Sequence, residues 1–489
     1  MKRALISLLA TSALSAAPSL NPVEAARLHD TATLRKLVEQ HADLNLAASD
    51  GATALHWAAY HDDVAMAELL IKAGANVNAA NRYGVKPLSI AASNGSARMI
   101  ELLLNANADA EATMGEGETA LMTAARSGSV EGIKLLIAHG AKVNSKEEWR
   151  GQTPLMWAAA EGHRPAVEAL IAAGAEINAR SKNGFTPFLF AVREGRKDVA
   201  AALLKAGVSA NEALPASLRR GGANAAHGST ALLLAVTNAH YELAAQLLDA
   251  GADPNEGVQG WNPLHIISDV RNPGTGSNDP APHGSGSMDS LELVRRLVAH
   301  GANVNARTAR SRNVGLTSLN TDGATPFLLA CRTNDVELMR VLVSLGADPS
   351  IPNVDGTTSL MVAAGVGTRS PGEDAGTEPE ALASVKYLVE ELKADVYAVD
   401  KNNDTVMHGP SYKHLPSVAA YLVARAPQAE RWNLKNKNGW TPLRMAVGVH
   451  RGMNLRSSPE TADILEKAMK AAAVATVVEP EAVISGATK

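Results

Sequence analysis

Apolar and polar positions along this chain follow a pattern that recurs about every 33 residues. The segment that begins at Gly51, "GATALHWAAYHDDVAMAELLIKAGANVNAANRY", shows the pattern clearly. It contains two short apolar runs, and the second places Ala67, Leu70 and Ile71 at helical spacing before it stops at Gly74. A polar turn separates the two runs, so each segment is expected to form two short helices that pack against each other.

The glycine that opens this segment marks an internal repeat. Equivalent positions follow at intervals of 32 to 47 residues, with one interval of 63 residues, and these positions are Gly84, Gly117, Gly151, Gly184, Gly228, Gly260, Gly323, Gly356, Asn403 and Gly439. A degenerate unit precedes them, because residues 25–45 align without gaps on residues 58–78. We therefore expect twelve units, of which the first is a cap.

Residues at fixed places in each unit suit the ends of helices. Threonines such as Thr153 can cap the first helix, and Pro154 follows at a position where the missing N–H does no harm. Glycines such as Gly162 and Gly174 can take the left-handed conformation that ends a helix. One unit alone cannot bury its apolar face, so stability is expected to come from stacking.

The period and the motifs "TALHWAA", "TPLMWAA", "NPLHIIS", "GANVNAA", "GAEINAR" and "GANVNAR" resemble the ankyrin repeat family, over roughly residues 22–470. The resemblance implies an all-α repeat solenoid, in which stacked helix-turn-helix units carry projecting β-hairpin fingers. It also implies a protein partner, bound by the finger tips and by the face of the first helices. Together with the N-terminal signal described below, the chain resembles exported bacterial ankyrin proteins in particular.

Composition excludes some other functions. The formal net charge is only -4, and no basic patch for nucleic acid is evident. Aromatic residues make up 3% of the chain, which suits thin stacked units better than a thick globular core. Cys331 is the single cysteine, so no intrachain disulfide can form, and we interpret it as a buried structural thiol.

The first 17 residues read as an export signal. Lys2 and Arg3 precede an apolar stretch, residues 4–17, that is too short to span a bilayer once processed. Cleavage is expected between residues 15 and 19, and an uncleaved anchor is the alternative. The sequence therefore predicts a periplasmic or secreted protein without an integral membrane segment after signal removal.

Insertions divide the repeats into two zones. Residues 18–211 are regular, whereas residues 212–470 carry inserted segments, and residues 471–489 read as a tail. The insertions are residues 212–227, 269–288, 307–322, 365–382 and 448–461. Long insertions confined to particular repeats are either functional or tolerated disorder, and the sequence leaves both readings open.

The unit at Asn403 is irregular. Gly409 and Pro410 lie inside its first helix, which should be shortened or distorted. Drift is one explanation, and a local cleft that holds residues 412–414 is the other. In the second case the unit, together with residues 269–288 and 365–382, would form one pocket of an enzyme or small-ligand binder.

Scarce aromatic residues and nearby arginines are the candidate partner-binding residues. They lie in or beside the predicted finger turns and are of the types that dominate binding hot spots: Tyr83, Arg82, Trp149, Arg150, Phe185, Trp261 and Trp440. The alternative is that each ring packs on the next finger.

No catalytic or metal-binding pattern is visible. His56, His265 and His408 share one repeat position, where the ankyrin resemblance implies a structural hydrogen bond to the finger. HExxH, paired CxxC and phosphate-binding glycine motifs are absent, so no cofactor and no metal are expected. The leading hypothesis is a non-enzymatic protein-binding scaffold, and a secreted effector that acts on host proteins is a further alternative.

Overall fold

The computed structural model describes residues 21–215, 228–274, 282–311, 318–426, 428–451 and 454–472. The predicted signal, residues 1–17, lies outside this range, as do most of residues 212–227 and 471–489 and parts of the other insertions. The chain divides into two compact units. Unit 1 comprises Met1–Ala191 with Ala201–Ala206, and unit 2 comprises Val192–Ala200 with Gly207–Lys489.

The described helices of unit 1 are short and follow one another at regular intervals. They are α1 (Pro22–Arg27), α2 (Thr31–Glu39), α3 (Ala54–Tyr60), α4 (Val64–Lys72), α5 (Pro87–Ser93), α6 (Ala97–Asn105), the 3-10 turn η1 (Gly115–Gly117), α7 (Ala120–Ser127), α8 (Val130–Ala138), α9 (Pro154–Glu161) and α10 (Arg164–Ala172). Two more helices, α11 (Pro187–Arg193) and α12 (Lys197–Lys205), contribute residues to both units.

Unit 2 continues the same alternation with longer connections. Its helices are α13 (Ala231–Thr237), α14 (Tyr241–Asp249), α15 (Pro263–Arg271), α16 (Ser290–Ala299), α17 (Pro326–Arg332), α18 (Val336–Ser344), α19 (Ser359–Ala363), α20 (Glu378–Lys386) with the π-turn η2 (Tyr387–Glu391), α21 (His408–Lys413), α22 (Pro416–Arg425), the 3-10 turn η3 (Ala429–Asn433), α23 (Pro442–Val447) and α24 (Pro459–Ala471). A hairpin of β1 (Val449–Arg451) and β2 (Asn454–Arg456) lies between α23 and α24.

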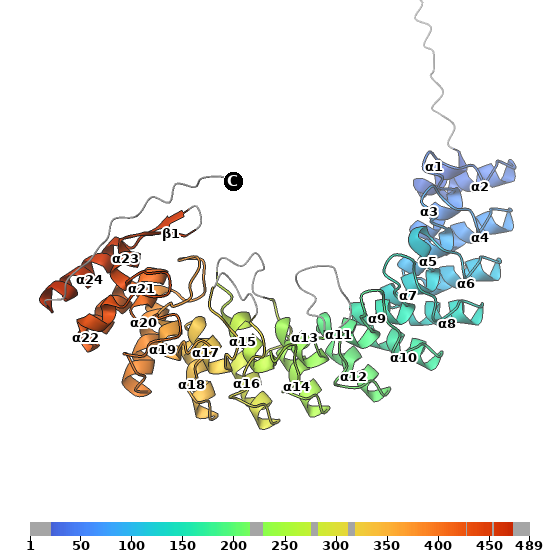
Figure 1. The fold of residues 1–489 in the computed structure, drawn as a ribbon. Coiled ribbons are helices and arrows are strands. Elements are labelled where there is room, and N and C mark those ends of the chain that lie inside the picture. Colours follow the sequence, from blue (N-terminus) through green and yellow to red (C-terminus); the bar gives the residue numbers. More distant parts are fainter. Residues whose placement is uncertain are drawn as a thin grey trace, which may run out of the picture. The chain divides into compact units, whose positions relative to one another are not determined.

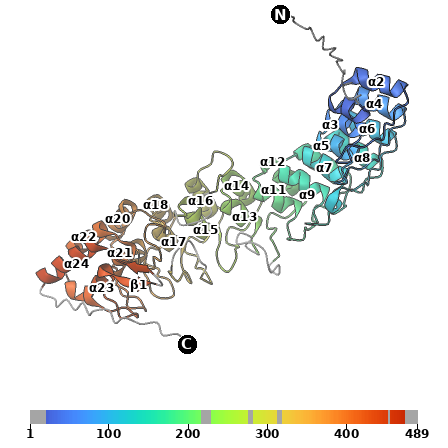
Figure 2. The ribbon, with the colours of Figure 1, turned by 90° about the horizontal axis from the view of Figure 1, so that it is seen from above.

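Each unit is built of two layers of helices. In unit 1, α1, α3, α5, α7 and α9 pack side by side in one layer, and α2, α4, α6, α8 and α10 form the other (Figure 1). In unit 2 the odd-numbered helices from α13 to α23 and the even-numbered helices from α14 to α24 form two such rows (Figure 2). The expectation of an all-α repeat solenoid is confirmed.

The glycines, helix caps and small residues of the repeat have the conformations and contacts that the sequence predicts. All ten marker glycines have positive φ, as does Asn403, which takes the glycine position with φ 58°. The Thr153 side chain accepts a hydrogen bond from the Met156 N–H, and Pro154 is the first residue of α9. Ala58 and Ala59 are fully buried where neighbouring first helices meet. Local backbone chemistry therefore sets the ends of most helices.

The projecting fingers are tight turns. Isolated β-bridges close some of the described turns, such as Thr113 with Thr119 and Val399 with Thr405. Among the described residues, β1 and β2 are the only strands paired as a sheet. Successive fingers are joined by backbone hydrogen bonds, such as the one from Glu148 N–H to the Glu116 carbonyl at 2.7 Å. The fingers of each unit therefore form a continuous row.

Helix α21 is shortened, as the sequence predicts. It begins at His408, so Pro410 lies in the first turn, where no backbone N–H is required. The expected cleft for residues 412–414 is split into two. Tyr412 lines one cavity, whereas Lys413 and His414 line another, because consecutive residues of a helix point about 100° apart.

The described part of the insertion at residues 269–288 is anchored at both ends. Asn272 Nδ2 donates to the Thr333 carbonyl at 3.0 Å, toward the following repeat. On the other side, Ser285 Oγ lies 3.0 Å from His240 Nδ1, and the Ser287 N–H donates to Glu242 at 2.8 Å. These contacts hold the insertion against two neighbouring repeats.

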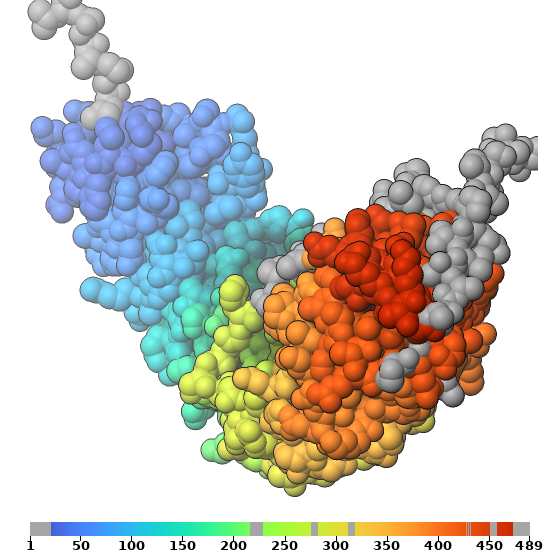
Figure 3. Space-filling model, turned by 90° about the vertical axis from the view of Figure 1, so that its left-hand side faces the viewer, coloured from blue at the N-terminus to red at the C-terminus, as the bar shows by residue number. Residues whose placement is uncertain are grey.

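The core is a series of thin apolar layers between repeats. Leu55 and Leu70 of unit 1 and Leu264 and Leu297 of unit 2 are fully buried at equivalent places. The space-filling view shows the last repeats of unit 2, orange to red, in direct contact with one another (Figure 3). Within the described ranges, no helix is both long and apolar enough to cross a bilayer.

Candidate functional site

Several finger turns are organised by one side-chain acceptor. In unit 1, Asn81 Oδ1 accepts from the N–H groups of Tyr83 and Val85 at 2.9 and 3.0 Å. Glu147, a buried carboxylate, does the same for Trp149, Arg150 and Gln152 at distances between 2.7 and 3.0 Å. Since these bonds fix the turn backbone, the residues at the tip project away from the repeat.

Two of the predicted aromatic residues are exposed at finger tips of unit 1. The exposed fractions are 72% for Tyr83 and 62% for Trp149, and their neighbours Arg82 and Arg150 are exposed as well. The Arg150 guanidinium lies over the Trp149 ring, 4.1 Å from its centroid. We call Arg82, Tyr83, Trp149 and Arg150 the finger-tip surface. It presents aromatic area and arginine charge together, which is the chemistry of binding hot spots.

Phe185 and Trp261 do not belong to an exposed surface. Phe185 is buried, and its ring centroid lies 5.2 Å from that of Phe190. Trp261 is completely buried, and its indole N–H donates to the Arg310 carbonyl at 2.9 Å. Both rings are buried, so neither is available to a partner in this conformation. Trp261 packs against the next finger through Arg310, as the packing alternative expects. Phe185 packs instead against Phe190 of α11 in its own repeat.

Trp440 lies at the edge of a groove in unit 2. This groove, which we call the finger groove, is a cavity of about 550 Å³ between successive fingers and the first helices. It is lined by residues from four fingers and from the loop after α19, including Asn320, Asp355, Asp400, Asn402, Asp404, Tyr412, Lys437 and Trp440. Three carboxylates, one lysine and two aromatic rings therefore share one concave surface.

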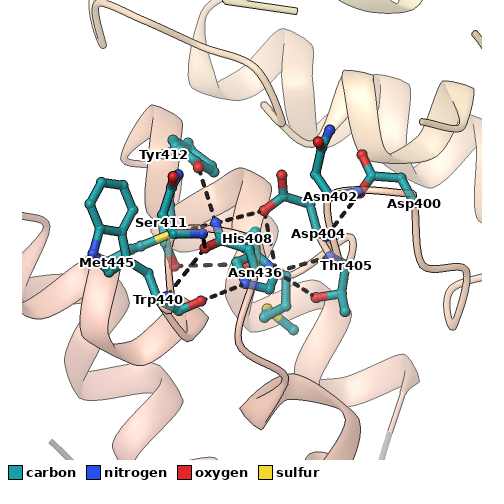
Figure 4. Close-up of polar contacts among 12 residues, drawn as sticks. Asp400, Asn402, Asp404, Thr405, His408, Ser411, Tyr412, Asn436, Trp440 and Met445 are labelled. Atoms are coloured by element: carbon teal, nitrogen blue, oxygen red, sulfur yellow. Dashed lines mark hydrogen bonds and ion pairs between the residues drawn. The ribbon is translucent and has the colours of Figure 1, made fainter. Parts of the chain in front are cut away.

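Hydrogen bonds hold the walls of the finger groove in place. Asn436 Nδ2 donates to Asp404 Oδ1 at 3.0 Å and to the Tyr412 hydroxyl at 3.2 Å, so it fixes an acid against an aromatic ring (Figure 4). Asp400 accepts from the N–H groups of Asn402 and Asp404 and from the Thr357 hydroxyl at 2.8 to 2.9 Å. These contacts join three successive fingers into one rigid wall.

The recurrent histidines connect each first helix to the next finger. Nδ1 of His408 accepts from the Thr405 N–H at 2.9 Å, so Nε2 carries the proton and donates to the Trp440 carbonyl at 3.2 Å. His56 and His265 make the same contacts with Val85 and Ala306, both at 3.0 Å. Burial lowers the pKa of His265 and of His408 to about 4. The structural role implied by the resemblance is confirmed.

The structure offers little that could support chemistry. Nowhere in the described ranges do three or more His, Cys, Asp or Glu side chains gather in a way that could hold a metal ion. Cys331 is completely buried, and burial raises the pKa of its thiol. A protonated thiol without access to solvent is a poor nucleophile.

Sequence reasoning missed most of the finger groove. Asp355, Asp400 and Asp404 belong to fingers whose sequences vary, and only their stacking reveals that they share one surface. A signal for the turn acceptors was present, since Asn81, Asn353 and Asn436 each lie three residues before a marker glycine. Glu147 takes this role one residue earlier, because its unit is one residue longer.

Comparison with known families finds ankyrin repeats. The family described as ankyrin repeats in three copies matches residues 23–114, 88–181, 121–213 and 283–369, and a further ankyrin repeat matches residues 227–257. The three-copy matches together cover more than half of the chain. The ankyrin repeat and LEM domain-containing protein 1 homolog of Caenorhabditis elegans is 42% identical over 81 residues, which are 17% of this chain and 10% of that protein. The chain thus matches only a tenth of that relative's length.

Proposed function

Because the chain belongs to the ankyrin repeat family, we propose that it is a non-enzymatic protein-protein interaction scaffold of twelve repeats, exported from the cytoplasm. The count of twelve is supported by the succession of helices from α1 to α24, which follow one another as first and second helices. The interaction role is supported by the family, whose repeats act as protein-binding modules, and by the two surfaces described above.

The observation that carries the proposal is the exposure of Tyr83 and Trp149 on one row of fingers. Both side chains present large aromatic area to solvent, and burial of such a ring against a partner is strongly favourable. The backbone beneath both rings is fixed by Asn81 and Glu147. A partner would therefore lose little conformational freedom of this chain on binding.

Site-specific photocrosslinking in the native cell tests this proposal. A photoreactive phenylalanine analogue at position 83 or 149 is expected to crosslink one discrete protein. The matched control is the same analogue at Lys72, whose side chain is 77% exposed at the end of α4 and far along the repeat from the finger. If all three positions crosslink the same proteins or none, the finger-tip surface is not the interaction surface.

The finger groove supports a second contact within the same function. The lining of the groove contains three carboxylates and one lysine, namely Asp355, Asp400, Asp404 and Lys437. It also contains the aromatic rings of Tyr412 and Trp440. Carboxylates next to aromatic rings suit a lysine or arginine side chain, so we infer that the groove takes a basic segment of the partner. Trp440→Ala should weaken binding of the captured partner, and a partner whose binding is unchanged by this variant contacts another surface.

Export and the periplasmic or secreted location are part of the proposal. They rest on Lys2, Arg3 and the apolar stretch at residues 4–17. Cell fractionation followed by N-terminal sequencing tests them. A mature chain that begins between residues 16 and 20 in the periplasm or the medium supports export, whereas an intact N-terminus in the cytoplasm contradicts it.

A further inference from the structure

Three irregular segments of unit 2 meet at the edge opposite the fingers and enclose a second cavity, of about 590 Å³. Its walls come from residues 272–274 after α15, residues 371–380 before and within α20, and residues 413–415 between α21 and α22. We call it the loop cavity. The size lies within the range of sites that hold small molecules. In a regular repeat these connections are tight turns that leave no such space.

Charged contacts hold the walls of the loop cavity together. The Arg332 guanidinium, 3% exposed, pairs with Asp269 and, at 3.4 Å, with Asp374, so it links the two insertions. Lys413 Nζ donates to the Ala375 carbonyl and thereby links the third segment. Gly274 lies so close to Ala375 that a side chain there would collide with its backbone. These contacts between the three segments therefore define the shape of the cavity.

Lys413 lines the loop cavity and can donate more hydrogen bonds than it does within the described structure. The residue is 5% exposed, and an ammonium group has three N–H donors. Of the described residues, only Ala375 accepts from it. Burial lowers its pKa to about 8 in spite of the attraction of Asp374 and Glu380. A buried ammonium with unused donors is best stabilised by an oxygen acceptor, above all by a carboxylate.

Two carboxylates that line the loop cavity, those of the half-buried Glu378 and the exposed Glu380, can accept further hydrogen bonds. Glu378 Oε1 accepts from the Ser417 N–H at 2.7 Å, and Glu380 Oε2 accepts from the N–H and hydroxyl of Thr377 at 2.7 and 2.8 Å. The other oxygen of each group makes no hydrogen bond within the described structure. These oxygens suit an ammonium donor. Pro273, Pro371 and Leu415 supply apolar surface between the charges.

We propose that the loop cavity binds a small zwitterionic molecule of the α-amino-acid or short-peptide class. The ligand carboxylate accepts from Lys413, and the ligand ammonium donates to Glu378 and Glu380. A purely anionic ligand is disfavoured by the two glutamates, and a purely cationic ligand is disfavoured by Lys413. This binding activity is independent of the protein partner proposed above, because it uses the opposite edge of unit 2.

Calorimetric titration of the full mature chain tests the proposal. The probes are the common L-amino acids and a set of dipeptides, each with its N-acetyl and C-terminal amide derivative. At least one unmodified probe is expected to bind more tightly than about 1 mM. Both of its derivatives should bind at least about tenfold more weakly, since each lacks one of the two charges. Equal binding of a probe and its derivatives, or no binding in the whole panel, overturns the proposal.

Variants locate the binding. Lys413→Met keeps the length of the buried side chain without its charge, and it should weaken binding at least about tenfold. Glu378→Gln with Glu380→Gln keeps an acceptor for each helix cap, so it should leave the fold intact while it weakens binding similarly. The control is Lys386→Met, an exposed lysine in the last turn of α20. Should Lys413→Met fail to fold, the double glutamine variant decides, and unchanged binding in it refutes the site.

Discussion

Aromatic residues beside the marker glycines are used differently in the two units. Trp149 in unit 1 and Trp261 in unit 2 both lie within two residues of a marker glycine, yet their exposed fractions are 62% and 0%. Trp149 lies two residues before its marker glycine, at the tip of the turn, whereas Trp261 lies one residue after its marker glycine. The finger after Trp261 belongs to an insertion, and the Arg310 carbonyl of that finger accepts the indole N–H. An inserted finger can thus contribute to the burial of an aromatic ring in the preceding repeat.

The insertions of unit 2 also contribute to two concave sites, the finger groove and the loop cavity. Unit 1 presents side chains outward from regular fingers. In unit 2, segments such as residues 318–320 and 371–376 cover the fingers at one edge and the connections at the other. In the proposals above, the regular array contacts its partner through exposed side chains, and the elaborated array binds a basic segment and a small molecule in its cavities. The following predictions test this contrast.

Replacing the buried tryptophan should give the largest effect. Trp261→Ala removes a completely buried ring and its hydrogen bond, and we expect a loss of about 3 to 5 kcal/mol in the stability of unit 2. Trp149→Ala should change the free energy of unfolding by less than about 0.5 kcal/mol. Hydrogen exchange resolved by peptide measures both. A similar loss of stability in the two variants would show that the two tryptophans do not differ in burial as described.

The buried ion network should have the next largest effect. Arg332→Met removes the cation that Asp269 and Asp374 share, so unit 2 should lose about 3 kcal/mol. The matched control is Arg340→Met, which breaks a pair with Glu391 that is 51% exposed on both sides and should cost at most about 1 kcal/mol. Urea unfolding followed by hydrogen exchange measures the free energy of unfolding of both variants. Equal losses in Arg332→Met and Arg340→Met would show that the network is not effectively buried.

Acid should weaken unit 2 through its two deeply buried histidines. The pKa values of His265 and His408 are lowered to about 4, so the unfolded chain takes up these protons first as the pH falls below about 6.5. Stability is therefore lost between about pH 6.5 and pH 4, by about 2 kcal/mol per histidine at pH 5.

The test compares wild type with His265→Met, since Met156 occupies the same repeat position in unit 1. The unfolding free energy of the wild type minus that of the variant should fall as the pH is lowered across that window, and it should stay constant outside it. A difference that stays constant from pH 7 to pH 5 would mean that the His265 ring is protonated equally in the folded and unfolded chains.

Much of the fold follows from the sequence because the signals are local. Thr153, Pro154 and Gly162 fix one helix through contacts within a few residues, and the repeat pattern uses the same chemistry again in other units. The burial of Trp261 is different, because it depends on Arg310, which lies 49 residues along the chain. The meeting of residues 272–274 with 371–380 depends in the same way on packing across several repeats. Sequence patterns raised that meeting only as one hypothesis among others.

The smallest predicted effect concerns Lys413, and it tests whether the loop cavity carries an under-compensated charge. The pKa of Lys413 is lowered to about 8, so between about pH 8 and pH 10.5 the unfolded chain binds a proton that the folded chain has released. Stability attributable to this residue therefore rises with pH, by about 1 kcal/mol from pH 7 to pH 9. The facing groups are Asp374, Arg332, Glu378, Glu380 and His414. Since these remain in Lys413→Met, the difference in unfolding free energy between wild type and this variant isolates the lysine. A difference that does not change across this range would show that the ammonium is fully compensated within the protein, and the cavity would then have no charge left for a ligand carboxylate to neutralise.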